Sequence, residues 1–200
     1  MLSRGQPLNC FGAEHLRVIF ESKLGSELNT WKQLAPLFFS NFFHKNDHIV
    51  RAGESWGELC FIHEGLLRVY YSDSKGREVN QHFYERGEVI YPVSDNSVCK
   101  FNIQALESTT LMIANYQDLS NRNAINTEWG QIELNLLKSS FLKNAKREAR
   151  LLIADTENRY LWFCREYPQL VKKLPQYQIA SFLGVTPVTL SRLKLNTPEF

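Results

Sequence analysis

The chain has 200 residues, of which 44% are hydrophobic and 22% are charged. These values are ordinary for a globular protein with one large domain or two small ones. No apolar run reaches the roughly 18 residues that a membrane span needs, and the first ten residues lack the apolar core of a signal peptide. We therefore expect a cytoplasmic protein that does not bind a membrane.

Charge is unevenly distributed along the chain, although the formal net charge is only +2. Residues 1–139 hold 13 Lys and Arg against 16 Asp and Glu, whereas residues 140–200 hold 10 against 5. A basic segment favours a polyanionic partner, because Lys and Arg neutralise phosphates. The charge distribution therefore predicts that a nucleic acid would bind to the C-terminal part.

The N-terminal segment, residues 13–35, has a helical period. Leu16, Ile19, Phe20 and Leu24 recur on one helical face, and Gly25 interrupts the pattern. We expect one helix before this glycine and a second, short helix over residues 28–34.

Residues 38–119 change to the period of β-strands. Short apolar runs alternate with turns that contain glycine, among them Gly53, Gly65, Gly76 and Gly87. The predicted strands cover residues 59–63, 66–71, 79–84, 89–91, 101–105 and 109–114, after a first run at 48–53. Many short strands at regular intervals are typical of an antiparallel sandwich or jelly roll.

Residues 121–195 return to a helical period. Ile125, Trp129, Ile132 and Leu136 recur at spacings of four, three and four residues, which is typical of the seam between two packed helices. We predict that these residues form the interface of a homodimer; the alternative is that this helix packs on its own domain. Another helix is expected to begin at residues 151–153 and to end near Pro168, since proline disfavours helix in the residue before it.

The segment Leu174–Leu193 is the most informative part of the sequence. Its pattern predicts two short helices around a tight turn, with Pro175 at the start of the first helix and Gly184 in the turn. Thr186 is a good N-cap for the second helix, and Pro187 fits its first position. The inner faces are expected to contain Ile179, Ala180, Leu183, Leu190 and Leu193.

The second helix of this segment then turns short polar and basic side chains outward. The candidate DNA-binding residues are Thr186, Val188, Thr189, Ser191, Arg192 and Lys194. Arginine can pair with guanine through two hydrogen bonds, and Thr and Ser can reach phosphates or base edges. The segment therefore predicts a helix-turn-helix that reads double-stranded DNA, with an ordinary helical hairpin as the alternative.

The chain resembles the cyclic-AMP receptor protein/fumarate-nitrate regulator (Crp/Fnr) superfamily over roughly residues 13–195. The residues that carry the resemblance are 65–71 with 76–78, 85–90, and the trio Ala180, Gly184 and Arg192. The resemblance implies an α+β fold with a cyclic-nucleotide-binding-like β jelly roll over 1–120, a long dimerisation helix over 121–147 and a helix-turn-helix domain over 148–200. It implies a transcription regulator with double-stranded DNA, a second copy of the chain and RNA polymerase as candidate partners.

Two departures from the family pattern change what the resemblance implies. Where cyclic-AMP binders carry a ribose-binding Glu and a phosphate-binding Arg, this chain reads Tyr91-Pro92-Val93 and Cys99-Lys100. We therefore expect no cyclic-AMP cofactor and a pocket for another effector, or one filled by aromatic rings. Its candidate residues are Phe83, Tyr91, Cys99, Lys100 and Phe101. The second departure is that few residues follow the second helix, so we expect a short or absent wing.

Two rival functions follow from the same residues. Jelly rolls of the cupin type bind metals through a His-x-His motif, and although His44, His48, His63 and His82 lie in or near the β segment, none forms that motif. We therefore expect no metal site and no enzyme activity. The other rival is a signalling or scaffold protein that keeps the roll without binding DNA.

Overall fold

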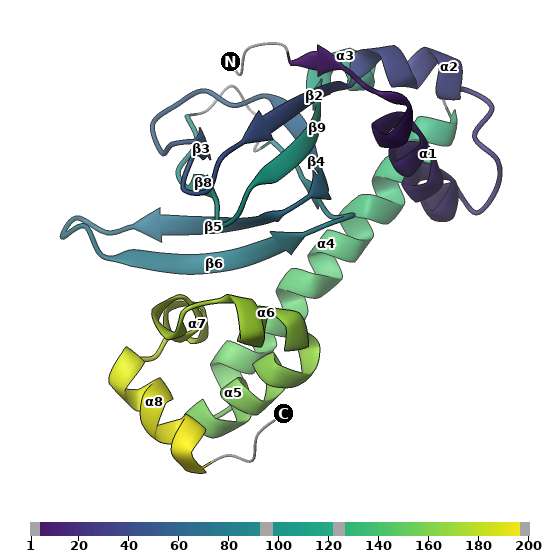
Figure 1. Cartoon of the computed structure of the whole chain (residues 1–200). Helices are drawn as coiled ribbons and strands as arrows, with labels where there is room; N and C mark the ends of the chain where they lie inside the picture. Colours follow the sequence, from purple (N-terminus) through teal and green to yellow (C-terminus); the bar gives the residue numbers. More distant parts are fainter. Residues whose placement is uncertain (1–4, 93–97, 122–126, 197–200) are drawn as a thin grey trace. The chain divides into compact units, whose positions relative to one another are not determined.

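The computed structural model of the chain describes residues 5–92, 98–121 and 127–196 (Figure 1). The chain divides into two compact units. Unit 1 comprises residues up to Tyr71 together with His82–Ser139, and unit 2 comprises Ser72–Gln81 together with the residues from Ser140 onward. No helix in these three described ranges is both long and apolar enough to span a membrane. The division inferred from the sequence, a roll over 1–120, a dimerisation helix over 121–147 and a helix-turn-helix domain over 148–200, stays a prediction.

The predicted pair of helices lies near the start of unit 1. Helix α1 (Cys10–Leu24) starts where the side-chain oxygen of Asn9 accepts a hydrogen bond from the backbone N–H of Gly12 at 2.7 Å, and this N-cap satisfies one free donor of the first turn. Helix α2 (Trp31–Leu34) continues into the 3-10 helix η1 (Ala35–Leu37). The prediction of two helices in this segment is confirmed.

Two sheets form the roll of unit 1, and only the tip of the β5–β6 hairpin belongs to unit 2. One sheet has the strand order β1-β2-β9-β4-β7 and the other β3-β8-β5-β6 (Figure 1). The strands are β1 (Gln6–Pro7), β2 (Phe39–Phe43), β3 (His48–Val50), β4 (Glu58–Glu64), β5 (Leu66–Ser72), β6 (Glu78–Glu85), β7 (Val89–Ile90), β8 (Asn102–Ala105) and β9 (Thr109–Asn115). All seven predicted runs contain a strand, and β1 and β2 are additional. The predicted fold class, a β jelly roll followed by a helical C-terminal region, is confirmed.

Strand β4 shows how the roll is buried on both faces. Leu59 and Phe61 lie in a hydrophobic cluster with α1, whereas Cys60 and Ile62 lie in a second cluster with side chains of the opposite sheet. A strand that is buried on both faces needs no polar residues in alternation, which explains its unbroken apolar run. The second cluster is the interior of the roll.

Helices make up most of the described residues after β9. Their bounds are α3 (Tyr116–Asn121), α4 (Thr127–Ile153), α5 (Thr156–Glu166), α6 (Pro168–Lys173), α7 (Gln176–Leu183) and α8 (Pro187–Asn196). The prediction that residues 151–153 begin a helix is wrong, because they end α4. The next helix starts after Asp155, whose side chain accepts a hydrogen bond from the backbone N–H of Asn158 at 2.8 Å.

The predicted dimer seam needs a correction. Trp129, Ile132 and Leu136 are 0%, 0% and 3% exposed, because they pack into the cluster of unit 1 that contains Phe20 of α1. Side chains buried in their own unit cannot contact a second chain, so the alternative of packing on the same domain holds for these three. Ile125, the fourth residue, lies outside the described residues.

Candidate nucleic-acid interface

Helices α7 and α8 of unit 2 are joined by a tight turn at Gly184. This residue has φ 69° and ψ 32°, and its N–H donates to the carbonyl oxygens of Ala180 and Ser181. A left-handed backbone costs least at glycine, so the glycine stops α7 and reverses the chain at once. Ala180, with no exposed surface, leaves room for α8 to approach α7.

Helix α8 starts at Pro187 directly after its N-cap. The hydroxyl oxygen of Thr186 accepts a hydrogen bond from the backbone N–H of Thr189 at 3.1 Å, and the carbonyl of Thr186 accepts from the N–H of Leu190 at 3.0 Å. Pro187 needs no partner for a backbone donor at this position. The local sequence alone therefore fixes where α8 begins.

The inner faces of α7 and α8 form the core of unit 2. Ile179, Leu183 and Leu190 are at most 1% exposed, and Leu193 is half-buried. Phe182 of α7 packs against Phe163 of α5, with ring centroids 5.4 Å apart. This packing holds α8 in one orientation and leaves its other face in solvent.

The exposed face of α8 contains the predicted DNA-binding residues. Val188 is 61% exposed, Thr189, Ser191 and Arg192 are also exposed, and Lys194 is half-buried. Thr186 is exposed too, but its hydroxyl caps the helix and shares a hydrogen bond with the hydroxyl of Thr189 at 2.8 Å. Arg192 and Ser191 are therefore the side chains of this group that are best placed for a new partner.

Further basic side chains of unit 2 are exposed to solvent. They are Arg165 of α5 and Lys172 and Lys173 at the end of α6. Residues 140–200 as a whole carry ten basic and five acidic residues. A surface of this charge attracts a polyanion over the range that salt screening allows.

Sequence reasoning missed the contacts that hold the hairpin tip against α7 within unit 2. The backbone N–H of Asn80 donates to the hydroxyl of Ser181 at 2.9 Å, and that hydroxyl donates to the carbonyl of Glu78 at 3.1 Å. The side chain of Asn80 donates to the carbonyl of Gln178 at 3.0 Å. The one available signal was that Gln178, a polar residue, falls among the apolar residues of α7.

Arg147 of α4 completes this anchor. One nitrogen of its guanidinium donates to the carbonyls of Asn80 and Phe182 at 3.1 and 3.0 Å. The same group lies 4.5 Å from the centre of the Phe182 ring, a favourable cation–π geometry. Burial lowers the pKa of Arg147. The arginine thus ties α4 to α7 and to the tip of the β5–β6 hairpin.

The five candidate effector-pocket residues do not gather in one place. Tyr91 packs on the cluster that contains α1, and its ring meets that of Tyr116 with centroids 6.1 Å apart. Cys99 and Phe101 belong to the interior cluster, where the Cys99 thiol donates to the Phe101 carbonyl at 3.2 Å. Burial raises the pKa of both Tyr91 and Cys99.

The other two candidates differ from each other in burial. Phe83 is only 2% exposed, whereas Lys100 is exposed to solvent. The structure therefore does not bring the five into one pocket, because Tyr91 lies on one cluster, Cys99 and Phe101 lie in or on the other, and Lys100 is at the surface. Val93, one of the residues at which the sequence departs from cyclic-AMP binders, lies outside the described residues.

Comparison with known proteins identifies the roll. Residues 40–122 match the cyclic nucleotide-binding domain family, so the chain contains a domain of this class. No curated protein matches the chain.

Solved structures extend the similarity to most of the chain. FixK2 from Bradyrhizobium japonicum is 19% identical, with a TM-score of 0.67, over 80% of this chain and 83% of its own. The c-di-GMP-responsive global regulator CLP of Xanthomonas campestris is 15% identical, with a TM-score of 0.64, over 80% and 87%. A protein from Eubacterium rectale, described as a transcriptional regulator of the Crp/Fnr family, is 15% identical, with a TM-score of 0.64, over 84% and 86%. The chain thus shares its fold with these regulators, in agreement with the resemblance to the Crp/Fnr superfamily seen in its sequence.

Proposed function

We propose that the chain is a sequence-specific, DNA-binding transcription regulator of the Crp/Fnr type. The observation that carries the proposal is the geometry of α7, the Gly184 turn and α8, which leaves Ser191 and Arg192 exposed on a rigid helix. A helix presented in this way enters the major groove, where arginine reads guanine. The basic charge of residues 140–200 supplies the attraction to phosphates.

The regulator acts as a homodimer that places two copies of α8 about 34 Å apart, one turn of DNA, on a near-palindromic site. The side chains of α4 that suit the interface are not Trp129, Ile132 and Leu136 but Leu134, Leu137 and Phe141. They are 45%, 43% and 71% exposed and recur at spacings of three and four residues, which places them on one helical face. An effector in the roll would act by changing the position of α8, not by touching DNA.

A DNA-binding assay across salt concentrations tests the proposal. Random-pool selection with and without cyclic nucleotides first supplies the target site, and affinity is then measured as the salt rises. A regulator loses affinity steeply with salt, because each phosphate contact releases counterions. Binding that is absent at low salt would leave the scaffold function as the better account.

Arg192→Ala separates base reading from charge. If Arg192 contacts guanine, its loss costs about 1–3 kcal/mol on the selected site and much less on random DNA. Arg165→Ala is the matched control, because it removes the same charge from an exposed position of α5. Equal losses on both kinds of DNA would show that Arg192 contacts phosphate only.

A further inference from the structure

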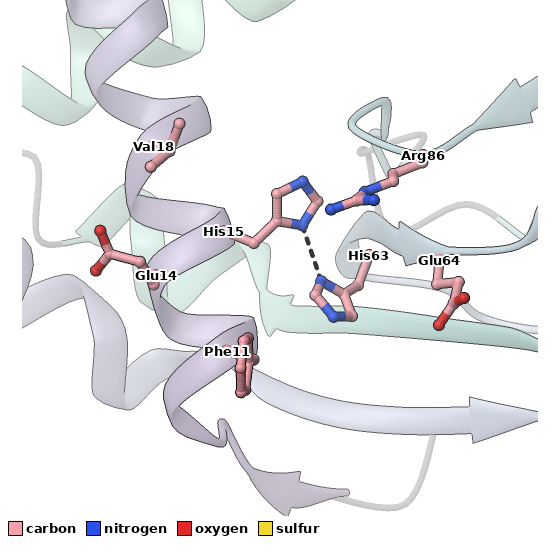
Figure 2. A pocket seen from close by; sticks show the side chains of 7 residues that line it. All are labelled: Phe11, Glu14, His15, Val18, His63, Glu64 and Arg86. Atoms are coloured by element: carbon pink, nitrogen blue, oxygen red, sulfur yellow. Dashed lines mark hydrogen bonds between the residues drawn. The ribbon is translucent and has the colours of Figure 1, made fainter.

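A surface pocket of about 470 Å³ lies in unit 1, outside the interior of the roll (Figure 2). Its lining comes from three elements that are distant in sequence: α1, the end of β4 and the turn that follows β6. None of its residues belongs to the helix-turn-helix or to the effector pocket predicted from the sequence. Its chemistry can therefore be assessed independently of DNA binding.

Three basic groups meet in this pocket. The Nδ1 atoms of His15 and His63 lie 2.8 Å apart, and the two rings meet edge to face with centroids 4.9 Å apart. Figure 2 shows the two imidazoles pointing toward each other, with the Arg86 guanidinium beside His15. Burial, the Arg86 charge and His63 all lower the pKa of His15.

The acidic residues of the pocket form no ion pair with Arg86 among the described residues. They are Glu14 of α1 and Glu64 of β4. A short Nδ1–Nδ1 contact requires one ring to donate and the other to accept. The accepting Nδ1 therefore carries no proton. An anion between the rings and Arg86 would favour a further proton on the pair.

Two apolar side chains extend the same pocket. Phe11 and Val18, on α1, are 86% and 53% exposed. Their place beside the basic groups suits a ligand with an apolar body and a charged end. The fixed charge of Arg86 beside His15 disfavours a metal cation on the two imidazoles.

We propose that this pocket binds a small organic anion, a carboxylate or a phosphate monoester. Its charged end lies between Arg86 and the imidazoles of His15 and His63, and its apolar body lies against Phe11 and Val18. Charge-assisted hydrogen bonds from Arg86 hold the charged end. Binding takes up a proton on the histidine pair, so affinity rises as the pH falls.

Titration of the full chain tests the proposal. The chain has five histidines, so the ring Hε1 resonances can be followed by NMR and assigned with His15→Gln and His63→Gln. The probes are benzoate and phenyl phosphate, which separate the two anion types, inorganic phosphate, which lacks an apolar body, and benzamide, which lacks the charge. We expect saturable shifts of His15 and His63 with benzoate or phenyl phosphate, and weaker binding of the other two probes.

The variants and the pH sharpen the test. Arg86→Gln should weaken binding by about tenfold or more, whereas Arg51→Gln, an exposed control outside the pocket, should not. Raising the pH from about 6 to about 8 should weaken binding in the parent chain and much less in His15→Gln.

Four outcomes would overturn the proposal. They are no saturable binding of either organic anion, binding of benzamide as tight as that of benzoate, equal effects of the two arginine variants, and saturation of the histidine pair by zinc independently of Arg86. The last outcome would make the pocket a cation site. None of the four depends on whether α8 binds DNA, so a failure here is distinct from a failure of the proposed regulator.

Discussion

Arg147 offers the sharpest test of how α7 is held within unit 2. Arg147→Ala removes donation to two carbonyls, those of Asn80 and Phe182 at 3.1 and 3.0 Å, and a guanidinium 4.5 Å from the Phe182 ring. A hydrogen bond from a charged donor contributes about 1.5–3 kcal/mol, and a cation–π contact about 0.5–2 kcal/mol. Relief of the buried charge offsets part of this sum, which leaves a loss of about 2–4 kcal/mol in the stability of unit 2.

Native-state hydrogen exchange measures this loss locally. The amides of α7 should exchange roughly 30 to 1,000 times faster in Arg147→Ala, since 1.36 kcal/mol corresponds to a factor of ten. Arg147→Met keeps an apolar stem over Phe182 but lacks the donors. Its α7 amides should exchange at rates between those of the parent chain and those of Arg147→Ala. Arg150→Ala, an exposed position on the same helix, is the control. Equal exchange in the Arg147 and Arg150 variants would refute the anchoring role.

Three further predictions follow from the described contacts. Thr186→Ala should destabilise α8 by about 1 kcal/mol, the usual cost of an N-cap, and unchanged exchange of the α8 amides would contradict this. Phe141→Glu should shift the chain toward monomer in light scattering, whereas Lys146→Glu, exposed on the same helix, should leave the mass unchanged. The pKa of His15 is lowered from 6.5 by burial, Arg86 and His63, so the unfolded chain binds this proton more readily and stability falls as the pH drops below about 6.5. Urea unfolding at several pH values should show a smaller fall of the unfolding free energy in His15→Gln than in the parent chain. Parallel dependence of the two free energies on pH would contradict this role of His15.

Local backbone chemistry made α7 and α8 predictable. Gly184 permits the left-handed turn, Thr186 caps the next helix and Pro187 fits its first position, and each of these roles depends only on neighbouring residues. The strands were predictable for a similar local reason, because turns that contain glycine lie at the ends of their apolar runs. Strand β2 (Phe39–Phe43) was missed, because its sequence of Phe, Ser and Asn carries little alternation.

The helix seam shows where periodicity stops being informative. The spacing of Trp129, Ile132 and Leu136 correctly indicates one apolar helical face, but an apolar face packs equally well on its own domain or on a second chain. Only the position of α1, with Phe20 in the same cluster, decides between them. The break after Ile153 was missed because neither Gly nor Pro marks it; the N-cap Asp155 was the available signal.

The hairpin anchor was out of reach of the sequence for a different reason. Asn80 and Gln178 are 98 residues apart in the chain, and no local rule pairs a polar strand residue with a polar helix residue at that separation. Once the two residues are known to be buried, their hydrogen bond is expected, because a buried amide needs partners. Such contacts depend on how the whole of unit 2 packs, not on either segment.

The described interior of the roll is lined by apolar side chains and suits a cyclic nucleotide poorly. The cluster between the sheets consists of apolar side chains such as Leu67, Val69 and Ile103. Arg68 lies between Leu67 and Val69 in the sequence and is buried, but its side chain points to the opposite face of the strand. There it donates to the side-chain oxygen of Gln104 at 2.9 and 2.7 Å and lies over the Tyr70 ring. A cyclic phosphate buried in the cluster would lack a cation from these strands, and an unpaired buried charge costs several kcal/mol. Cyclic AMP should therefore leave DNA affinity unchanged in the selection experiment, and a clear increase would mean that residues beyond those strands, Lys100 among them, supply the missing charge.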